Sequence, residues 1–365
     1  MEENKRSFDF PLFIITLILI LMGLIMIMSA SGVKAYSQFG NAHFFFRRQL
    51  IFAIAGLFLM YVTSLVNYKI YSKISKMILL LSFILLGLVI IPGVGKTAGG
   101  ATRWIPLGFF DFQPSEVVKI SLIIYISSFI SRKRNKIRSF KKGILPVLIV
   151  IMVIAFLIMQ QPDMGTAVNI VGFAFIILIA GGMRLKHLFF ISIPGLLTVI
   201  YYITSAPYRL NRVKTFLDPW KDPRGSGYHI IQSLIALGSG GLTGVGPGNS
   251  RQKFLYLPEP GTDFIFAILG EEFGLIGALF VIILFGSFAY RGTLIALNAK
   301  DLFGTLLAVG ITSMIMIQFL INIGAVTSLL PVTGITLPFI SYGGSSLVIS
   351  LFSVGILLNI SRESI

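Results

Sequence analysis

Long apolar runs alternate with short polar segments along the whole chain. A helix needs about 20 apolar residues to cross the hydrocarbon core of a bilayer. Only helices and closed barrels satisfy their backbone hydrogen bonds there. The pattern predicts ten membrane helices, near 11–30, 49–67, 74–92, 114–131, 144–161, 165–183, 187–204, 264–287, 303–324 and 344–361. We therefore expect an all-α polytopic membrane protein in which residues 1–365 form a single membrane domain.

One of the predicted boundaries leaves two interpretations open. The helices at 144–161 and 165–183 meet at Pro162 and Asp163, within the stretch QQPDMG. A proline followed by an aspartate is typical of a turn, but proline also produces a break inside a longer helix. The pattern therefore favours two helices here and does not exclude two halves of longer tilted segments.

Composition and charge agree with a chain dissolved in lipid. Of all residues 55% are hydrophobic and 12% are charged, whereas globular domains carry about a quarter charged residues. The formal net charge is +16, but the basic residues lie between apolar runs and form no single exposed face, so we expect no nucleic-acid partner. The chain has no cysteine, which excludes disulfides, thiolate metal sites and a cysteine nucleophile.

The basic residues of the short loops predict the orientation, because lysine and arginine are retained on the cytoplasmic side. Lys5 and Arg6 precede the first helix, and a dense basic cluster occupies 132–142. Placing these segments inside predicts that both termini are cytoplasmic.

The same orientation makes residues 205–262 a large extracytoplasmic loop between the seventh and eighth helices. Within this loop, YHIIQSLIALGSGG has apolar residues at helical spacing, which favours a short helix lying on the membrane surface. Glycines recur from Gly238 to Gly248, and we expect a mobile segment there because glycine is the least restricted residue.

Asp263 closes the long loop and opens the eighth helix, in the stretch LPEPGTDFIF. Aspartate is a favoured helix N-cap, and capping alone is a sufficient reason for its presence. A carboxylate at the membrane boundary beside Phe264 and Phe266 is also partly desolvated, which raises its pKa towards the range of a general base. The sequence leaves both interpretations open.

Five further charges are expected at the same outer level. Glu116 and Lys119 are three residues apart on the fourth helix, a spacing that allows an ion pair, although the high energy of charge in a bilayer equally favours a polar cavity. The others are Arg48, Arg103 and Asp163. Singly, each is typical of a solvated loop. Together they predict a polar cleft in which arginine binds pyrophosphate.

Two more acidic residues lie below Asp263. Glu271 and Glu272 follow it by about two helical turns, so at least one of them must point into the protein. We expect structural pairing for them.

At this point the motifs resemble a known family, the SEDS proteins (shape, elongation, division, sporulation). The most specific stretches are GATRWIPLG and FQPSEVVK within 100–119, QPDMGTA at 161–167, the block 216–274 and PVTGITLPFISYGGSS at 331–346. The resemblance covers nearly the whole chain. Within the family, the loop sequences are more similar to the division and sporulation types, FtsW and SpoVE, than to the elongation type, RodA, and we favour FtsW.

The resemblance implies ten membrane helices and a glycosyltransferase that polymerises lipid II beside a class B penicillin-binding transpeptidase and other division proteins. It also implies that the aspartate of TDFIF, Asp263, is catalytic. The chain departs from the family pattern at Gly261, where histidine is frequent, and at Pro247. These departures make the details of the loop less transferable than the aspartate.

The expected function is thus peptidoglycan polymerisation on the outer face of the cytoplasmic (inner) membrane, at the division septum. Asp263 is the expected base, and substrate binding is assigned to Arg48, Arg103, Glu116, Lys119 and Asp163. No metal site is predicted from the sequence, and a divalent cation, Mg²⁺ or Mn²⁺, is the one cofactor candidate. The alternatives are a lipid II transporter and a non-catalytic division scaffold.

Overall fold

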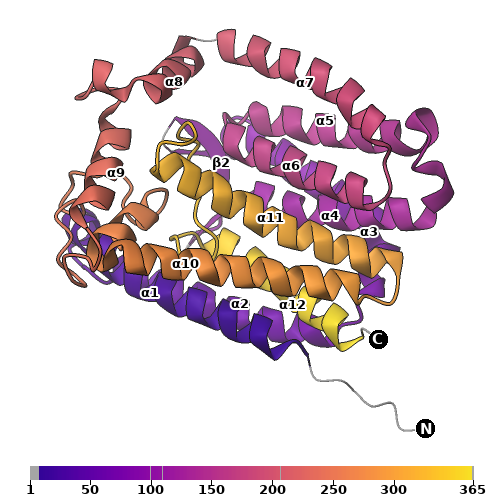
Figure 1. Ribbon diagram of the computed structural model, residues 1–365, viewed down its shortest axis with the longest axis horizontal. Helices are drawn as coiled ribbons and strands as arrows, with labels where there is room; N and C mark the ends of the chain where they lie inside the picture. The colour runs from indigo at the N-terminus through magenta and orange to yellow at the C-terminus, as the bar shows by residue number, and fades with distance from the viewer. Residues whose placement is uncertain (1–7, 99, 109, 206, 364–365) are drawn as a thin grey trace.

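A computed structural model describes residues 8–363 except 99, 109 and 206. Its main body is a bundle of long helices that run side by side (Figure 1). These helices are α1 (Phe10–Phe39), α2 (Phe44–Leu65), α3 (Lys69–Ile90), α4 (Pro114–Arg132), α5 (Leu145–Met159), α6 (Met164–Ala180), α7 (Leu185–Thr204), α10 (Ile265–Leu297), α11 (Leu302–Val326) and α12 (Gly344–Arg362). Each coincides with one of the ten predicted spans.

Eight helices in the described part of the chain are long and apolar enough to cross a membrane, with α5 counted together with the π-turn Phe140–Ile144 that precedes it. The other two of the ten are α6, which has 17 residues, and α7, which has 20. The turn at Pro162 and Asp163 separates α5 from α6 as two helices. The prediction of an all-α polytopic membrane protein is confirmed.

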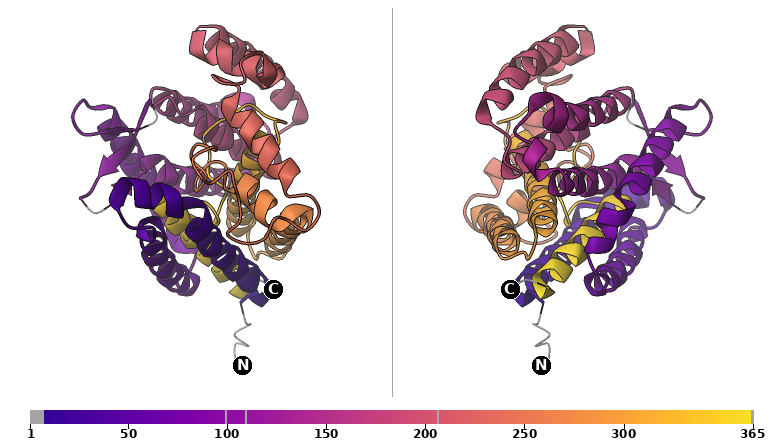
Figure 2. Two further views of the ribbon diagram at one scale, coloured as in Figure 1. Left: turned by 90° about the vertical axis from the view of Figure 1, so that its left-hand side faces the viewer. Right: turned by 90° about the vertical axis from the view of Figure 1, so that its right-hand side faces the viewer.

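Close helix contacts form where glycine removes a side chain, as is common in membrane bundles. A Cβ at Gly355 of α12 would lie 2.5 Å from the carbonyl oxygen of Met60 in α2, and a Cβ at Gly56 would lie 2.6 Å from a methyl carbon of Leu351. Helices α4, α11 and α12 are the most buried of the spans. By contrast, α7 lies at the edge of the bundle, apart from α10 and α12 (Figures 1 and 2).

The start of α1 and the end of α12, near the two limits of the described residues, lie at the same end of the bundle (Figure 1). The Asp9 carboxylate pairs with Arg291 near the end of α10, and the Asp9 backbone N–H donates to Ser361 Oγ of α12 at 3.0 Å. This placement agrees with termini on one side of the membrane. Lys5 and Arg6, on which the predicted orientation partly rests, lie outside the described residues.

A small antiparallel sheet between α3 and α4 was not predicted. Its strands are β1 (Lys96–Ala98), β2 (Ala101–Pro106) and β3 (Asp111–Phe112), in the order β1-β2-β3. Lys96 is opposite Trp104 and Ile105 is opposite Phe112. The sheet lies at the end of the bundle away from the termini and holds Arg103 there (Figure 1).

The long loop between α7 and α10 is largely helical. The predicted surface helix is confirmed as α9 (Tyr228–Ser239), whereas α8 (Pro207–Leu217) and the 3₁₀ turn Pro219–Lys221 were not predicted. Both helices lie over the end of the bundle that carries β2 (Figure 1).

The glycine-rich segment after α9 fills a break in α10. Gly274 has φ 65° and ψ −163°, a conformation that is essentially restricted to glycine. There the N–H groups of Leu275 and Ile276 donate to carbonyls of the loop, Gly241 O and Leu242 O, at 2.9 and 3.1 Å, and loop N–H groups donate in return to Glu271 O and Glu272 O. The loop thus satisfies backbone groups that the broken helix cannot pair. These bonds fasten the segment to α10 and argue against the mobility that its glycines predicted.

Candidate active site

A polar cavity of about 880 Å³ opens at the end of the bundle opposite the termini. Its walls come from α2, α4, α6, β2, α8, α9 and the loops before α10 and α12. All six predicted site residues line it: Arg48, Arg103, Glu116, Lys119, Asp163 and Asp263. The structure therefore brings together residues that are up to about 200 positions apart in the chain. Their individual roles remain predictions.

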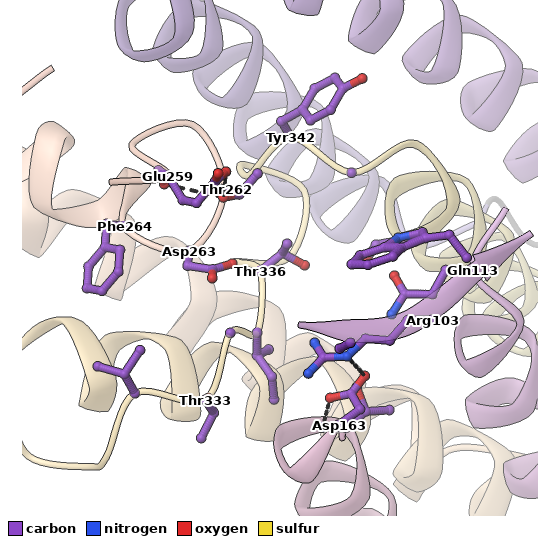
Figure 3. A pocket seen from close by; sticks show the side chains of 18 of the residues that line it. Arg103, Gln113, Asp163, Glu259, Thr262, Asp263, Phe264, Thr333, Thr336 and Tyr342 are labelled. Carbon is purple, nitrogen blue, oxygen red and sulfur yellow. Dashed lines mark hydrogen bonds and ion pairs between the residues drawn. The ribbon is translucent and has the colours of Figure 1, made fainter. Parts of the chain in front are cut away.

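Asp263 does not cap α10. The N-cap position is Phe264, and no side-chain hydrogen bond caps the helix. In the described part of the chain the Asp263 carboxylate has neither a hydrogen bond nor an ion pair, and it points into the cavity (Figure 3). The capping interpretation is therefore wrong, and the side chain is left free for chemistry.

The surroundings of Asp263 favour its protonated form. Protein surrounds the carboxylate, which meets solvent only through the cavity. Burial raises the pKa of Asp263 to about 6; the nearby Glu259 carboxylate acts in the same direction and the Arg103 guanidinium opposes it. A pKa of this size places the group in the range where a carboxylate both accepts and releases a proton near neutral pH.

Backbone tethers fix the position of Asp263. The Asn322 side chain on α11 donates to Asp263 O at 2.8 Å and to Ile335 O at 2.7 Å. The Ser341 hydroxyl donates to Thr262 O at 2.6 Å, and the Tyr342 N–H donates to Gly261 O at 2.9 Å. The loop between α11 and α12 is thereby joined to the segment that carries the aspartate.

Arg103 faces Asp263 across a glycine. A Cβ at Gly334, which has φ +73°, would lie 3.6 Å from Asp263 Oδ2 and 3.9 Å from Arg103 Nη1. Arg103 is held from behind, because its Nε lies 3.6 Å from Asp163 Oδ2 and its Nη2 donates to the carbonyl of Pro162. Figure 3 shows the arginine and the aspartate on facing walls. Asp163 in turn caps α6 through Thr166 N at 3.1 Å.

The floor of the cavity contains a buried ion pair. Glu116 Oε2 and Lys119 Nζ are 2.8 Å apart, and both side chains are nearly inaccessible to solvent. Lys119 also donates to Gln318 Oε1 at 2.8 Å, and Gln318 Nε2 donates to Thr336 O at 3.0 Å. The predicted ion pair is confirmed, and the predicted polar cavity is present as well, so the two interpretations are compatible.

Pairing accounts for most of the charge in the cavity. Three ion pairs lie within the described lining: Lys96 with Asp111, Arg103 with Asp163, and Lys119 with Glu116. Glu259 also lines the cavity and pairs with Lys34, which is not part of the lining. Among the described lining residues, two cations have no acidic partner. These are Arg48, which stacks on Phe44 and bonds to Tyr342, and Arg212 of α8. The one acid left without a partner is Asp263.

The two free cations lie on different walls. Arg48 belongs to α2, and Arg212 belongs to α8, which lies on the far side of the bundle end from α2 in Figures 1 and 2. Burial lowers the pKa of the His229 imidazole on α9, and the charge of the nearby Arg212 acts in the same direction. An anionic ligand in the cavity therefore finds one uncompensated cation on either side.

The acidic residues of the cavity do not form a metal cage. Within the described ranges, no three histidine, aspartate or glutamate side chains come together in a way that could hold a metal ion. The acids other than Asp263 are already committed to lysine or arginine partners. The residues present therefore do not fit a protein-bound Mg²⁺ or Mn²⁺.

The structure also adds cavity residues that the sequence interpretation missed. Arg212 and His229 lie in the long loop, where positive charge carried no topological signal. Gln318 lines the cavity, and Asn322, which tethers the segment of Asp263, lies one helical turn further along α11. Two amides at that spacing on a membrane helix are a sequence signal of a polar site.

The two glutamates of α10 have structural partners, as predicted. Glu271 accepts from Ser250 Oγ and from Arg251 N at 2.9 Å, while Glu272 pairs with Lys253 at 3.0 Å and accepts from Ser29 Oγ. These contacts hold the loop 248–253 against α10.

The sequence and the structure both resemble known proteins. Residues 10–365 match the family FTSW_RODA_SPOVE, described as "Cell cycle protein". The chain is 50% identical over 364 residues to "Stage V sporulation protein E" of Bacillus subtilis, with full coverage of both chains. It is 44% identical over 355 residues to "Probable peptidoglycan glycosyltransferase FtsW" of Trichlorobacter lovleyi, covering 97% of this chain and 93% of that relative.

Two solved structures share the fold. One, described as "Structural coordination of polymerization and crosslinking by a peptidoglycan synthase complex", contains a chain that matches with a TM-score of 0.82, 27% identity and 98% coverage of both chains. The rod shape determining protein RodA of Thermus thermophilus matches with a TM-score of 0.73, 25% identity and 99% coverage of both chains.

Proposed function

Because this chain belongs to the FtsW/RodA/SpoVE family of cell cycle proteins, we propose that it is a peptidoglycan glycosyltransferase that polymerises lipid II at the outer face of the cytoplasmic membrane. The single observation that carries the mechanism is the charge pattern of the cavity. One unpaired carboxylate, Asp263, lies in a cavity whose unpaired cations are Arg48 and Arg212.

The reaction needs a base and a site for two lipid-linked pyrophosphates. The 4-hydroxyl of a GlcNAc unit attacks C1 of the MurNAc unit at the end of a growing chain. The new C1–O bond forms as the bond from C1 to the pyrophosphate oxygen breaks, with inversion from an α to a β-1,4 linkage. The electron pair leaves with undecaprenyl pyrophosphate, and the hydroxyl proton passes to Asp263, the only unpaired acid among the lining residues described.

The cations stabilise the charge that develops on the leaving group. Arg48 and Arg212 have no acidic partner to release, so each can bind one pyrophosphate without breaking an ion pair, one for each lipid-linked substrate. Arg103 is held by Asp163, and Lys119 is held by Glu116. This pairing supports a role in which Arg103 and Lys119 donate hydrogen bonds to the substrate from fixed positions. The hydrogen bond from Asn322 to Asp263 O supports the role of Asp263 as the base, because it holds the segment of the aspartate beside the sugar.

The extent of the cavity favours polymerisation over lipid transport. The cavity reaches only the first two turns of α4 and the last two to three turns of α11, where Lys119 and Gln318 form its floor. Below that floor the same helices are packed with fully buried apolar side chains such as Leu122, Ile123 and Ile311. A transporter would need a polar route through this layer.

A transpeptidase partner and septal localisation belong to the same proposal. The structural relative in a peptidoglycan synthase complex supports a class B transpeptidase as the partner, and similarity to FtsW and SpoVE supports a role in division or sporulation, with FtsW as our choice.

The test is a polymerisation assay with the purified protein, fluorescent lipid II and a gel that resolves glycan strands, run with and without the matching transpeptidase. We expect β-1,4-linked polymer in at least the paired reaction. A complete absence of polymer in both reactions, with lipid II moving between the leaflets of proteoliposomes, would instead establish the transporter.

A further inference from the structure

A second recess lies at the opposite end of the bundle from the active-site cavity, where α3 begins, α4 ends and α11 begins. Its volume is about 370 Å³, and its polar lining is Lys69, Ser72, Lys73, Ser131 and Asp301. The proposed reaction uses none of these residues. The two serine hydroxyls already bond to Ser128, which leaves the two lysine ammonium groups around the hollow as donors for a phosphate group.

The recess carries net positive charge. Its lining contains two lysines and one acid, Asp301. Lys69 Nζ lies 3.6 Å from Asp301 Oδ2, and Asp301 also accepts from Tyr68 Oη at 2.9 Å and from Gly304 N at 2.8 Å. Lys73 has no acidic partner in the described part of the chain. The Arg132 guanidinium, which donates to the carbonyl oxygen of Ser72, adds a further cation close by.

The basic start of α3 adjoins an apolar surface on the same helix. Lys69, Lys73 and Lys76 follow each other at helical spacing on one face of α3, and all three are exposed. The same face carries Met77, Leu80 and Ile84, which are 65, 61 and 52% exposed. In a spanning helix these apolar side chains lie in the hydrocarbon, directly beyond the basic end.

We propose that this recess binds the phosphate headgroup of an anionic glycerophospholipid of the cytoplasmic leaflet, with its acyl chains along the apolar face of α3. Retention of positive charge inside the cell explains why lysines occur at this end of the bundle. It does not explain why two of them surround a hollow beside hydroxyl groups. The adjoining apolar face favours a lipid over soluble phosphate, because only a lipid uses both surfaces.

The test titrates the full-length protein in detergent with phosphatidylglycerol or with phosphatidylcholine of the same acyl chains, using native mass spectrometry to count bound lipids. We expect wild type to retain one phosphatidylglycerol and to prefer it to phosphatidylcholine. Lys73→Gln should weaken this binding about fivefold, the contribution of one basic residue near a charged lipid surface. Lys142→Gln is the matched control, because Lys142 is exposed at the same end and is not part of the lining of this recess.

The inference would be overturned by equal binding by wild type and Lys73→Gln, by equal weakening in Lys73→Gln and Lys142→Gln, or by displacement of the lipid by millimolar inorganic phosphate. Lys73→Arg keeps the charge and should retain the lipid. A loss of binding in both Lys73 variants with unchanged thermal unfolding would also contradict a charge-based site.

Discussion

Asp263 differs from every other acid in the cavity because it has no partner. The sequence alone could not establish this, since an aspartate before a helix is equally typical of a cap. The structure places the cap position at Phe264 and leaves the carboxylate facing Arg103 across Gly334. At the scale of single residues, the site is therefore defined by which charges remain unpaired.

The raised pKa of Asp263 predicts the pH dependence of the reaction. A base must be deprotonated, so the polymerisation rate should fall about tenfold per pH unit below pH 6 and level off above it. Glu259→Gln removes a negative charge that raises this pKa, and should therefore move the midpoint of the rate profile to lower pH. Initial rates between pH 4.5 and 8.5 measure both effects, and a profile with the same midpoint in the variant would contradict the assignment.

The ion pair in the cavity floor predicts an unequal effect of single and double substitutions. Glu116→Ala or Lys119→Ala leaves one buried charge without its partner, which destabilises by about 3–5 kcal/mol, whereas the double substitution removes both charges. Each single variant should unfold at a lower temperature than the double variant. Thermal unfolding in detergent is the measurement, and additive losses would argue against the coupling.

Residue types in the sequence identified most of the charged residues of the site. They did not identify the amide side chain of Asn322 or the loop residue Arg212. Charges in a membrane protein are conspicuous because few are tolerated, and this made Glu116 and Lys119 visible. Arg212 was not predicted because it lies in α8, the helix of the long loop that the sequence did not reveal. Asn322 was overlooked because its role depends on a carbonyl 59 positions away in the chain.

Among the elements, α10 shows most clearly what periodicity cannot predict. Its apolar pattern continues through Gly274, so the sequence indicates one uninterrupted helix. The backbone turns there, and a loop 30 residues earlier supplies the missing hydrogen bonds. The strands β1 to β3 and helix α8 were missed because each is short and none coincides with a long apolar run.

The break in α10 predicts a sharp difference between two glycines of the same helix. A Cβ at Gly274 would lie 2.4 Å from Gly244 N and 2.5 Å from Leu242 O, whereas a Cβ at Gly286 meets nothing within 4 Å. Gly274→Ala should therefore lower the free energy of unfolding by at least about 1–3 kcal/mol, and Gly286→Ala should leave it unchanged or slightly higher. Equal thermal unfolding of the two variants would mean that the loop does not depend on this break.

For the whole molecule, the ten helices followed from hydropathy because the bilayer requires an apolar run of about 20 residues in a span. How the helices meet around a cavity could not be predicted, since it depends on contacts such as those of Gly56 and Gly355 between distant helices. The orientation in the membrane remains a prediction from charge, although both termini lie at the end of the bundle away from the cavity.

Cysteine labelling tests that orientation, and the background is clean because the chain has no native thiol. A cysteine at Ser226, in the loop between α8 and α9, should react with a membrane-impermeant maleimide added to intact spheroplasts. A cysteine at Ser139, between α4 and α5, should react only after lysis. Both positions are exposed. The inverse pattern would place the cavity in the cytoplasm and remove the proposed polymerisation from this chain.

The central claim is that Asp263 is the base of a lipid II polymerase, and the most direct measurement compares purified wild type, Asp263→Asn and Asp218→Asn on fluorescent lipid II. The asparagine at 263 keeps the size of the side chain but cannot accept the hydroxyl proton. Asp218→Asn makes the same change in the outer loop, outside the cavity lining. We predict polymer from wild type and Asp218→Asn, and none from Asp263→Asn despite equal thermal unfolding. Wild-type polymerisation by Asp263→Asn would contradict the account.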